Sequence, residues 1–287
     1  MTPALLLVVL SASPGAGFPR PELLMEACEL TVCPSRLTIV DVRPRSEHES
    51  GRIPGAIWID IRAWEKLFDP GDAAGWSQRL GDAGLDPRES VVVHGGDDVR
   101  DAARLWWILR YWGFRDVRLL NGGWAAWRAA GGCICCGPAC PCPTRSVRVE
   151  PQPGVHAARS DVLSLLRSSK PQVVDARSSE EHCGLKATAK RNGHIPGAVH
   201  LEWTETLDPA SKRFKSADEL QALIRERRID LDAPVVTYCQ SGGRAAVVAF
   251  VLELMGGRQV RNYYKSWAEW GNADDTPIEA TPASPQK

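Results

Sequence analysis

The chain has 287 residues, 44% of them apolar and 24% charged, so it is long enough for two ordinary domains with buried cores. Its 35 basic and 35 acidic residues give a formal net charge of zero, which argues against a nucleic-acid or anionic-membrane partner. The apolar run at residues 4–10 is too short to span a bilayer, and no Lys or Arg precedes it. We expect a cytoplasmic protein, with a secreted or periplasmic one as the alternative.

Internal similarity shows that the chain holds two copies of one unit. An Asp-x-Arg sequence beginning at Asp41 returns at Asp175, and an Ile-Pro-Gly-Ala sequence beginning at Ile53 returns at Ile195. Further matches follow in the same order, down to a Trp-x-x-Trp sequence near the end of each copy. Such ordered matches indicate a duplicated domain. The expected segments are a first domain over residues 20–131, a linker rich in Cys, Pro and Gly over 132–154, and a second domain over 155–280.

Short β-branched runs alternate with longer helical patterns in each copy. In the second copy, the predicted strands lie at 172–175, 234–238 and 259–263, and the predicted helices lie at 216–228 and 245–255. The strands are almost continuously apolar, which is typical of a sheet covered on both faces. Each copy is therefore predicted to be an α/β domain with a doubly wound, mostly parallel sheet and helices on both faces. The tail beyond Ile278 is predicted to be disordered.

The nine cysteines form an unusual pattern, because five of them lie within residues 133–142 and the others are scattered. An odd count leaves at least one thiol outside any intrachain disulfide, and the pattern is unlike that of a disulfide-stapled secreted domain. The cluster has ligands for a soft metal such as zinc or copper(I). Its prolines, its adjacent cysteines and its lack of His favour instead a flexible linker with unbonded thiols, and we expect no metal.

The clearest candidate site is the sequence Thr-Tyr-Cys-Gln-Ser-Gly-Gly-Arg at residues 237–244. Cys239 lies between a predicted strand and a predicted helix, at the end of a parallel sheet where ligands bind. A thiolate is the reactive form of cysteine, and positive potential stabilises it. Arg244 and the N-terminus of the predicted helix supply such potential. Inward-facing backbone N–H groups supply more, and the residues that carry them are Gln240, Ser241, Gly242 and Gly243. The alternative is a packed core thiol.

These motifs together resemble the tandem-domain members of the rhodanese family, over residues from about 37 to 277. The resemblance implies two doubly wound domains, a catalytic cysteine at Cys239 in the second domain only, and a site in the crevice between the domains. The first copy agrees with this expectation, since Gly95 stands where the second copy has Cys239. We therefore expect the first domain to be catalytically silent and to form one wall of the crevice.

The resemblance also implies a sulfurtransferase reaction with no metal or organic cofactor. The Cys239 thiolate would take the outer sulfur of thiosulfate and release sulfite, and a thiophilic acceptor would then remove the persulfide sulfur. The partners would be a small-molecule sulfur donor and an acceptor, which is a thiol or a protein in the cell and cyanide in vitro. We expect the enzyme to be a monomer. The alternatives are a 3-mercaptopyruvate sulfurtransferase and a persulfide-carrying regulatory module. Phosphatases on a related fold have five residues between their Cys and Arg, whereas four lie between Cys239 and Arg244. The shorter loop argues against hydrolysis of phosphoesters.

One position departs from the family pattern. Mammalian members place a substrate-binding Arg four residues beyond the Asp-x-Arg arginine, and this chain has Glu181 there. Arg244 would take over that role, and Arg177 is a second candidate, with an ion pair to Asp175 or Glu181 as its alternative. The charge of Glu181 would repel a carboxylate, so thiosulfate is expected to be a better donor than 3-mercaptopyruvate.

Overall fold

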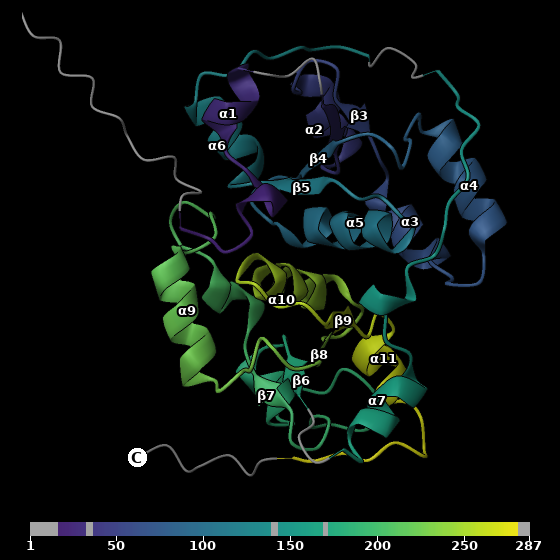
Figure 1. The fold of residues 1–287 in the computed structure, drawn as a ribbon, viewed down its shortest axis with the longest axis vertical. Coiled ribbons are helices and arrows are strands. Elements are labelled where there is room, and N and C mark those ends of the chain that lie inside the picture. The colour runs from purple at the N-terminus through teal and green to yellow at the C-terminus, as the bar shows by residue number, and fades with distance from the viewer. Residues whose placement is uncertain (1–16, 33–36, 139–142, 169–171, 281–287) are drawn as a thin grey trace, which may run out of the picture.

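The computed structural model describes residues 17–32, 37–138, 143–168 and 172–280. It contains two α/β units, which lie one above the other in Figure 1, and each is built on its own all-parallel sheet. The predicted fold class is confirmed. The apolar run at residues 4–10 lies outside the described residues. Within the described ranges, no helix is both long and apolar enough to cross a membrane.

The first unit has a five-stranded sheet in the order β1-β5-β4-β2-β3. Helices connect the strands, as all-parallel pairing requires. Its strands are β1 (Leu24–Met25), β2 (Thr38–Asp41), β3 (Ile57–Trp58), β4 (Val91–His94) and β5 (Val117–Leu120). Its helices are η1 (Pro21–Leu23), α1 (Ala27–Val32), α2 (Arg45–Ser50), α3 (Ile61–Leu67), α4 (Ala73–Asp82), α5 (Arg100–Tyr111) and α6 (Gly123–Ala129).

The second unit has a four-stranded sheet in the order β7-β6-β8-β9. Its strands are β6 (Val173–Asp175), β7 (Val199–His200), β8 (Val235–Tyr238) and β9 (Val260–Asn262). Its helices are η3 (Pro153–Val155), α7 (Arg159–Leu165), α8 (Ser179–His182), η4 (Trp203–Thr206), α9 (Ala217–Glu226), α10 (Gly243–Leu254) and α11 (Ser266–Trp270). All five elements predicted for this copy are present, with ends that differ by one or two residues.

Local sequence explains where these helices begin. Ser216 caps α9 through a capping box, in which the Glu219 carboxylate accepts the Ser216 backbone N–H at 2.9 Å. Helix α10 begins at Gly243, two residues earlier than predicted, because Gly242 with φ +86° turns the chain directly into it. The first turn of α10 therefore lies immediately beside Cys239.

The two sheets share one register at their centres. In the first unit Asp41 pairs with His94, and in the second Asp175 pairs with Tyr238. The residues that follow these strands, Gly95 and Cys239, therefore occupy the same place in the two copies. The structure thus places a glycine in one copy where the other has its candidate nucleophile.

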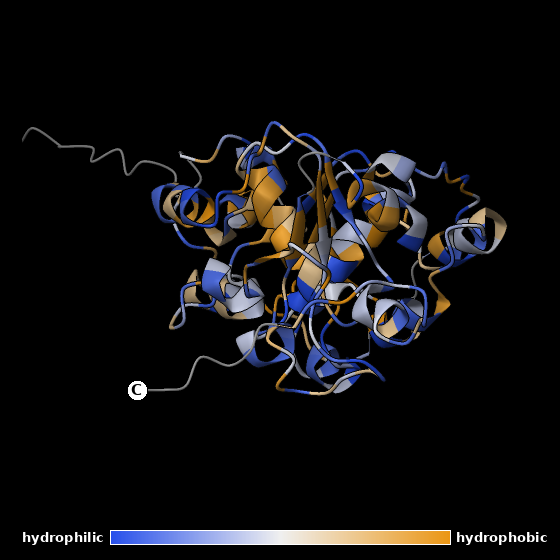
Figure 2. Ribbon diagram, turned by 90° about the horizontal axis from the view of Figure 1, so that it is seen from below, coloured by the Kyte–Doolittle hydropathy of each residue, from blue (hydrophilic) through white to orange (hydrophobic). Residues whose placement is uncertain are grey.

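The two units pack against each other through α5 and α10, the helices that follow β4 and β8 (Figure 1). Trp106 meets Phe250 edge-on with ring centroids 5.1 Å apart, and Trp107 stacks on Tyr264 at 4.8 Å. Each fully buried apolar side chain of this size contributes roughly 1.5–3 kcal/mol. One hydrophobic cluster runs through both units and each unit has a smaller cluster of its own, with hydrophobic residues along the central helices and strands (Figure 2).

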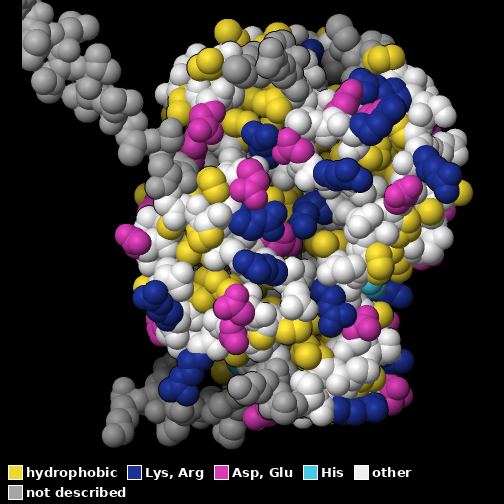
Figure 3. Space-filling model, in the orientation of Figure 1, with side chains coloured by type: hydrophobic (Ala, Val, Ile, Leu, Met, Phe, Trp, Pro, Cys, Tyr) yellow, Lys and Arg dark blue, Asp and Glu magenta, His cyan; other side chains and the backbone are white. Residues whose placement is uncertain are grey.

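Charged side chains of both signs are scattered over the surface drawn in Figure 3. On the face drawn in Figure 3, Lys and Arg side chains alternate with Asp and Glu, in keeping with the zero net charge. Several of these groups form ion pairs, such as Arg118 with Asp116 at 2.9 Å. Exposed pairs of this kind are worth about 0–1 kcal/mol each, so the shared core dominates the stability of the fold.

Two expectations about irregular segments need correction. The start of the cysteine cluster is anchored, since Cys135 exchanges two backbone hydrogen bonds with Arg52 at 2.9 Å and Trp127 donates to the Cys133 carbonyl at 2.9 Å. Glu279, in the tail, exchanges backbone hydrogen bonds with His194 at 2.7 and 2.9 Å. In both places, paired backbone groups fix a segment that composition alone suggested was flexible. Residues 139–142 and 281–287 lie outside the described residues.

Candidate active site

Cys239 lies directly after β8 and is 1% exposed. Its backbone N–H donates to the Ser266 hydroxyl at 3.1 Å, and its carbonyl accepts the Trp267 N–H at 2.9 Å. The preceding Thr237 is fixed as well, because its hydroxyl donates to the Ala245 carbonyl at 3.0 Å. These bonds hold the backbone of Cys239 on both sides, so the direction of its side chain is set by the fold.

The loop after Cys239 directs a backbone donor at the sulfur. The N–H of Gly242 donates to Sγ of Cys239 at 3.1 Å, a contact that suits a thiolate or a bound sulfur anion. Glycine is required there, since φ is +86° and a Cβ would lie 2.7 Å from a ring carbon of Tyr264. Asn262, at the end of β9, also fixes the loop, because its side-chain amide donates to the Gly242 carbonyl at 3.1 Å. The N-terminus of α10 adds positive potential at the same place.

Arg244, in the first turn of α10, forms a bidentate ion pair with Glu181. Its two terminal nitrogens donate to the two carboxylate oxygens at 2.6 and 2.9 Å. Burial opposes the charged form of Arg244, but Glu181 and the neighbouring Cys239 outweigh that effect and raise the pKa of Arg244. Burial likewise works against the Glu181 carboxylate, yet the bonds from Arg244 lower the pKa of Glu181. Glu181 therefore orients the loop cation and partly neutralises it.

The first domain closes the site from the opposite side. Together with the loop it encloses a cavity of about 170 Å³ at Cys239. The first-domain side chains that line this cavity come from α3 and α5, and they are Arg62, Glu65, Arg100, Asp101 and Arg104. The second-domain lining comprises Cys239, Gln240, Ser241, Gly243 and Arg244. The site thus lies between the two domains, with arginines on both sides.

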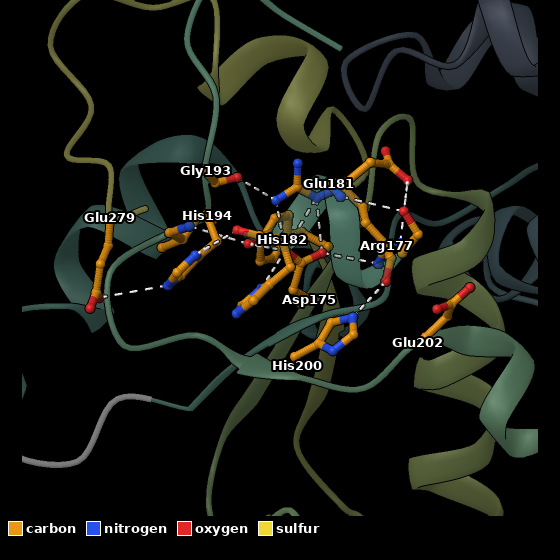
Figure 4. A network of polar contacts seen from close by, with 12 residues as sticks. Asp175, Arg177, Glu181, His182, Gly193, His194, His200, Glu202 and Glu279 are labelled. Carbon is orange, nitrogen blue, oxygen red and sulfur yellow. Dashed lines mark hydrogen bonds and ion pairs between the residues drawn. The ribbon is translucent and has the colours of Figure 1, made fainter. Parts of the chain in front are cut away.

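Every candidate residue of the loop except Gly242 lines this cavity, and Gly242 directs its N–H at the Cys239 sulfur. Arg177 is not part of the cavity lining. The Arg177 side chain is 0% exposed, and its Nη2 donates to Asp175 at 2.7 Å and to the Gly193 carbonyl at 2.7 Å. Figure 4 shows this arrangement, with His182 also bonded to Asp175, at 3.0 Å. A guanidinium buried in this way has no access to a substrate. The alternative expectation, an ion pair with Asp175, describes its place in the structure.

The Asp-x-Arg motif has the same structural role in both copies. In the first copy, Nη2 of Arg43 donates to Asp41 at 2.6 Å and to the Gly51 carbonyl at 2.7 Å. Its guanidinium lies over the Trp124 ring at 4.1 Å, as that of Arg177 lies over Trp267 at 4.3 Å. Since the first copy has no cysteine at the site, this repeated arrangement belongs to the fold and not to the chemistry.

Several residues at the site escaped the sequence analysis. Glu65, Arg104 and Tyr264 belong to no repeated motif. Docking of the first domain brings Glu65 and Arg104 to the loop, whereas Tyr264 follows β9 in the second domain and lies against Gly242. A signal existed for Arg104, which interrupts the otherwise apolar stretch of α5.

Among the described residues, no group of three or more Asp, Glu, His and Cys side chains is placed to bind a metal ion. Described thiols of the linker cluster, such as Cys133, are exposed and lie outside the Cys239 cavity.

Comparison with known proteins agrees with this architecture. The rhodanese-like domain family matches the chain twice, over residues 24–130 and 158–273. The thiosulfate sulfurtransferase of Azotobacter vinelandii is 31% identical over 260 residues, which cover 85% of this chain and 91% of that protein. The thiosulfate sulfurtransferase of Pseudomonas aeruginosa is 31% identical over 251 residues, with the same coverage of both proteins.

Solved structures give the same result. SseA from Escherichia coli, whose crystal structure is described as that of a 3-mercaptopyruvate sulfotransferase, superposes with a TM-score of 0.74 at 27% identity. The match covers 85% of this chain and 98% of SseA. Wild-type EanB superposes with a TM-score of 0.79 at 23% identity, over 91% of this chain and 70% of EanB. At that identity, the likeness to EanB concerns the fold alone.

Proposed function

This chain belongs to the rhodanese family and is a sulfurtransferase with two copies of the family domain, and we propose that it transfers sulfane sulfur from thiosulfate to a thiophilic acceptor through a persulfide on Cys239. The observation that carries the proposal is the Gly242 N–H directed at Sγ of Cys239 at 3.1 Å, in a cavity lined by arginines. The first domain has Gly95 at the position of the nucleophile and lines one side of the cavity, which supports a catalytically silent role for it.

The first half-reaction loads the cysteine. The Cys239 thiolate forms a bond to the outer sulfur of thiosulfate, the sulfur–sulfur bond of the donor breaks, and its electron pair leaves with sulfite. Negative charge passes from the thiolate to the departing sulfite. Arg244 and the N-terminus of α10 lie beside this path and favour the charge that develops there.

The second half-reaction unloads the cysteine. The thiolate of an acceptor attacks the terminal sulfur of the persulfide, the bond to Sγ of Cys239 breaks, and the Cys239 thiolate is restored. Cyanide takes the same sulfur to form thiocyanate. The donor and the acceptor need not bind together, so one small cavity suffices for both steps.

Glu181 supports thiosulfate as the preferred donor. Thiosulfate is a compact dianion, and the short range of the loop donors suits it. 3-Mercaptopyruvate needs a second contact for its carboxylate, and the Glu181 carboxylate is placed beside the cation that would supply one. The likeness to SseA supports 3-mercaptopyruvate as the second candidate donor. A further alternative is a protein that carries a persulfide without turning over small donors, and steady-state assays distinguish it from an enzyme.

Parallel steady-state assays with both donors and cyanide test this proposal, on the wild type and on Glu181→Gln. Gln keeps the size of Glu, whereas Arg at this position would face Arg244 at ion-pair distance. We expect kcat/KM in the wild type to favour thiosulfate by tens-fold or more, and we expect Glu181→Gln to narrow the preference several-fold. A preference of the wild type for 3-mercaptopyruvate, unchanged by the substitution, would contradict the choice of donor. Absence of turnover with either donor would favour a carrier.

A further inference from the structure

Arg104 is a buried arginine that the first domain extends to the loop of the second. It lies on α5, and its side chain is 6% exposed. Its Nη1 donates to the Ser241 carbonyl at 2.6 Å and to the Tyr264 hydroxyl at 3.1 Å, and its Nη2 donates to the Ser241 hydroxyl at 3.3 Å. A cation of the domain that lacks a nucleophile thus contacts the residues that surround Cys239.

The guanidinium of Arg104 lies against the start of α10. A Cβ added at Gly243 would be 2.6 Å from Nη2 and 3.2 Å from Nε of Arg104, so glycine at this position makes room for the arginine. The Nε of Arg104 is buried and has no hydrogen-bond partner among the described residues. Buried N–H groups are normally paired, and an oxygen of an anionic ligand in the cavity would pair this one.

The second domain shows that the fold does not need this arginine. In the register that aligns His94 with Tyr238, Arg104 falls on Val248, which is 0% exposed on α10. One copy of the same helix therefore has valine where the other has a buried cation. Because a buried charge costs free energy unless its surroundings use it, the arginine points to a role in the cavity.

Arg104 also differs from the other first-domain cations of the cavity. The side chains of Arg62 and Arg100 are 66% and 41% exposed, so solvent and salt screen them. Arg104 is screened least. Burial disfavours its charged form, but Tyr264, Glu65 and Cys239 together raise the pKa of Arg104. Arg104 is therefore a cation at neutral pH.

We propose that Arg104 binds the anionic end of the sulfur donor at Cys239. It would supply the positive charge that Arg244 offers only in part, because Glu181 partly neutralises Arg244. The inference rests on the proposed function and adds a residue that determines donor specificity. As the donor bond breaks, the electron pair leaves with sulfite, and the guanidinium stabilises that departing dianion. Glu65, whose carboxylate lies 2.9 Å from Arg104, orients the guanidinium and lowers its net attraction for the donor.

Two donors of different charge separate this role from simple support of the loop. Thiosulfate is a dianion and methanethiosulfonate a monoanion, and both offer a sulfane sulfur to Cys239. For Arg104→Gln we expect kcat/KM to fall about tenfold or more for thiosulfate and several-fold less for methanethiosulfonate, because the lost attraction scales with the donor charge. Arg104→Lys keeps the charge, so it should restore much of the wild-type ratio of kcat/KM for thiosulfate to kcat/KM for methanethiosulfonate.

Glu65→Gln tests the same idea in the opposite direction. Gln keeps an oxygen that accepts from Ser241, now 3.1 Å from Glu65, but it removes a negative charge from the cavity. The ratio of kcat/KM for thiosulfate to that for methanethiosulfonate should rise several-fold. Arg110→Gln is the matched control, because Arg110 lies on the same helix and pairs across the interface with Glu253, yet lies outside the cavity. That variant should leave the ratio unchanged, and thermal melting of all variants monitors the fold.

A ratio that stays constant in both Arg104→Gln and Glu65→Gln would overturn the inference and leave Arg104 as a support of the loop. If Arg104→Gln fails to fold, the Glu65→Gln result decides alone. Neither result bears on the proposed function, which would fail separately if the wild type transferred sulfur from neither donor.

Discussion

The two domains share a framework and differ in one loop. Both place an aspartate at the end of a central strand, pair it with an arginine, and lay that arginine over a tryptophan. After the neighbouring strand of the sheet, β4 or β8, the first domain continues with Gly95 and an Asp98–Arg100 ion pair, whereas the second continues with Cys239 and a donor at its sulfur. The framework is present in both copies, while the cysteine and the backbone donor at its sulfur are present in the second alone.

The comparison also shows what the first domain contributes. Its α5 packs on α10 and brings Arg104 to the loop of the other copy, and its α3 brings Glu65 there. A domain without a nucleophile thereby supplies half of the cavity. The features that the copies share are therefore a guide to the fold, and the features that differ are a guide to the site.

Apart from replacement of Cys239 itself, the largest effect is expected from a substitution in the loop that distinguishes the copies. In Gly242→Ala, the new Cβ would lie 2.7–2.8 Å from Tyr264 atoms, and the N–H donor at Cys239 would move. Loss of one such donor costs about 10²–10³-fold in rate, so kcat/KM should fall at least 100-fold. Gly197→Ala is the control, because Gly197 also has positive φ, +69°, but open space around its Cβ position. Near-normal activity of Gly242→Ala would show that the loop donor is dispensable.

A second difference between the copies concerns acid stability. Burial lowers the pKa of His94 to about 4, while Tyr238, in the same register, does not titrate near neutral pH. Below pH 6.5, His94 binds a proton in the unfolded state but not in the folded state. The contribution of neutral His94 to the free energy of unfolding is therefore fully present above pH 6.5 and is lost as the pH falls toward 4. The expected loss is on the order of 3 kcal/mol in the free energy of unfolding.

Denaturant unfolding between pH 7 and pH 4.5 measures this loss. The His94→Gln variant should show a flatter dependence of stability on pH than the wild type. Tyr238→Phe removes a 2.7 Å bond to Asp175 and should lower stability by a similar amount at every pH in this window. Equal slopes for the wild type and His94→Gln would contradict the assignment to His94.

The smallest effect is expected outside both frameworks, in the cysteine cluster. The described thiols there, such as Cys135, are exposed and lie outside the Cys239 cavity, and surface substitutions usually change stability by less than about 0.5 kcal/mol. Replacing all five cysteines of residues 133–142 by serine should therefore leave turnover within about twofold to threefold. Loss of activity together with a stoichiometric bound metal would show that the cluster is functional.

The sequence was sufficient for the features that depend on local chain. The duplication, the strands around the site, and a loop with Cys239 before Arg244 all follow from short contiguous segments, and the structure places them as expected. Local patterns also explain the start of α9 at its Ser216 cap.

Features that depend on distant contacts escaped prediction. For Arg177 the sequence allowed both a substrate contact and an ion pair with Asp175, and the structure shows the ion pair together with a bond to the Gly193 carbonyl, 16 positions away. The ion pair of Glu181 with Arg244 joins residues 63 positions apart, and Arg104 reaches the loop only because two domains dock. Periodicity and motif spacing carry no information on such contacts, which arise from packing between elements.

The most direct test of the account is the mass of the enzyme after treatment with thiosulfate and removal of excess donor. We predict one added sulfur atom per chain on the peptide that contains Cys239, its removal by cyanide as thiocyanate, and neither mass gain nor turnover in Cys239→Ser. Since serine is close in size to cysteine, the variant should keep the fold, which circular dichroism checks. Sulfur found on another peptide, with turnover persisting in Cys239→Ser, would contradict the central claim.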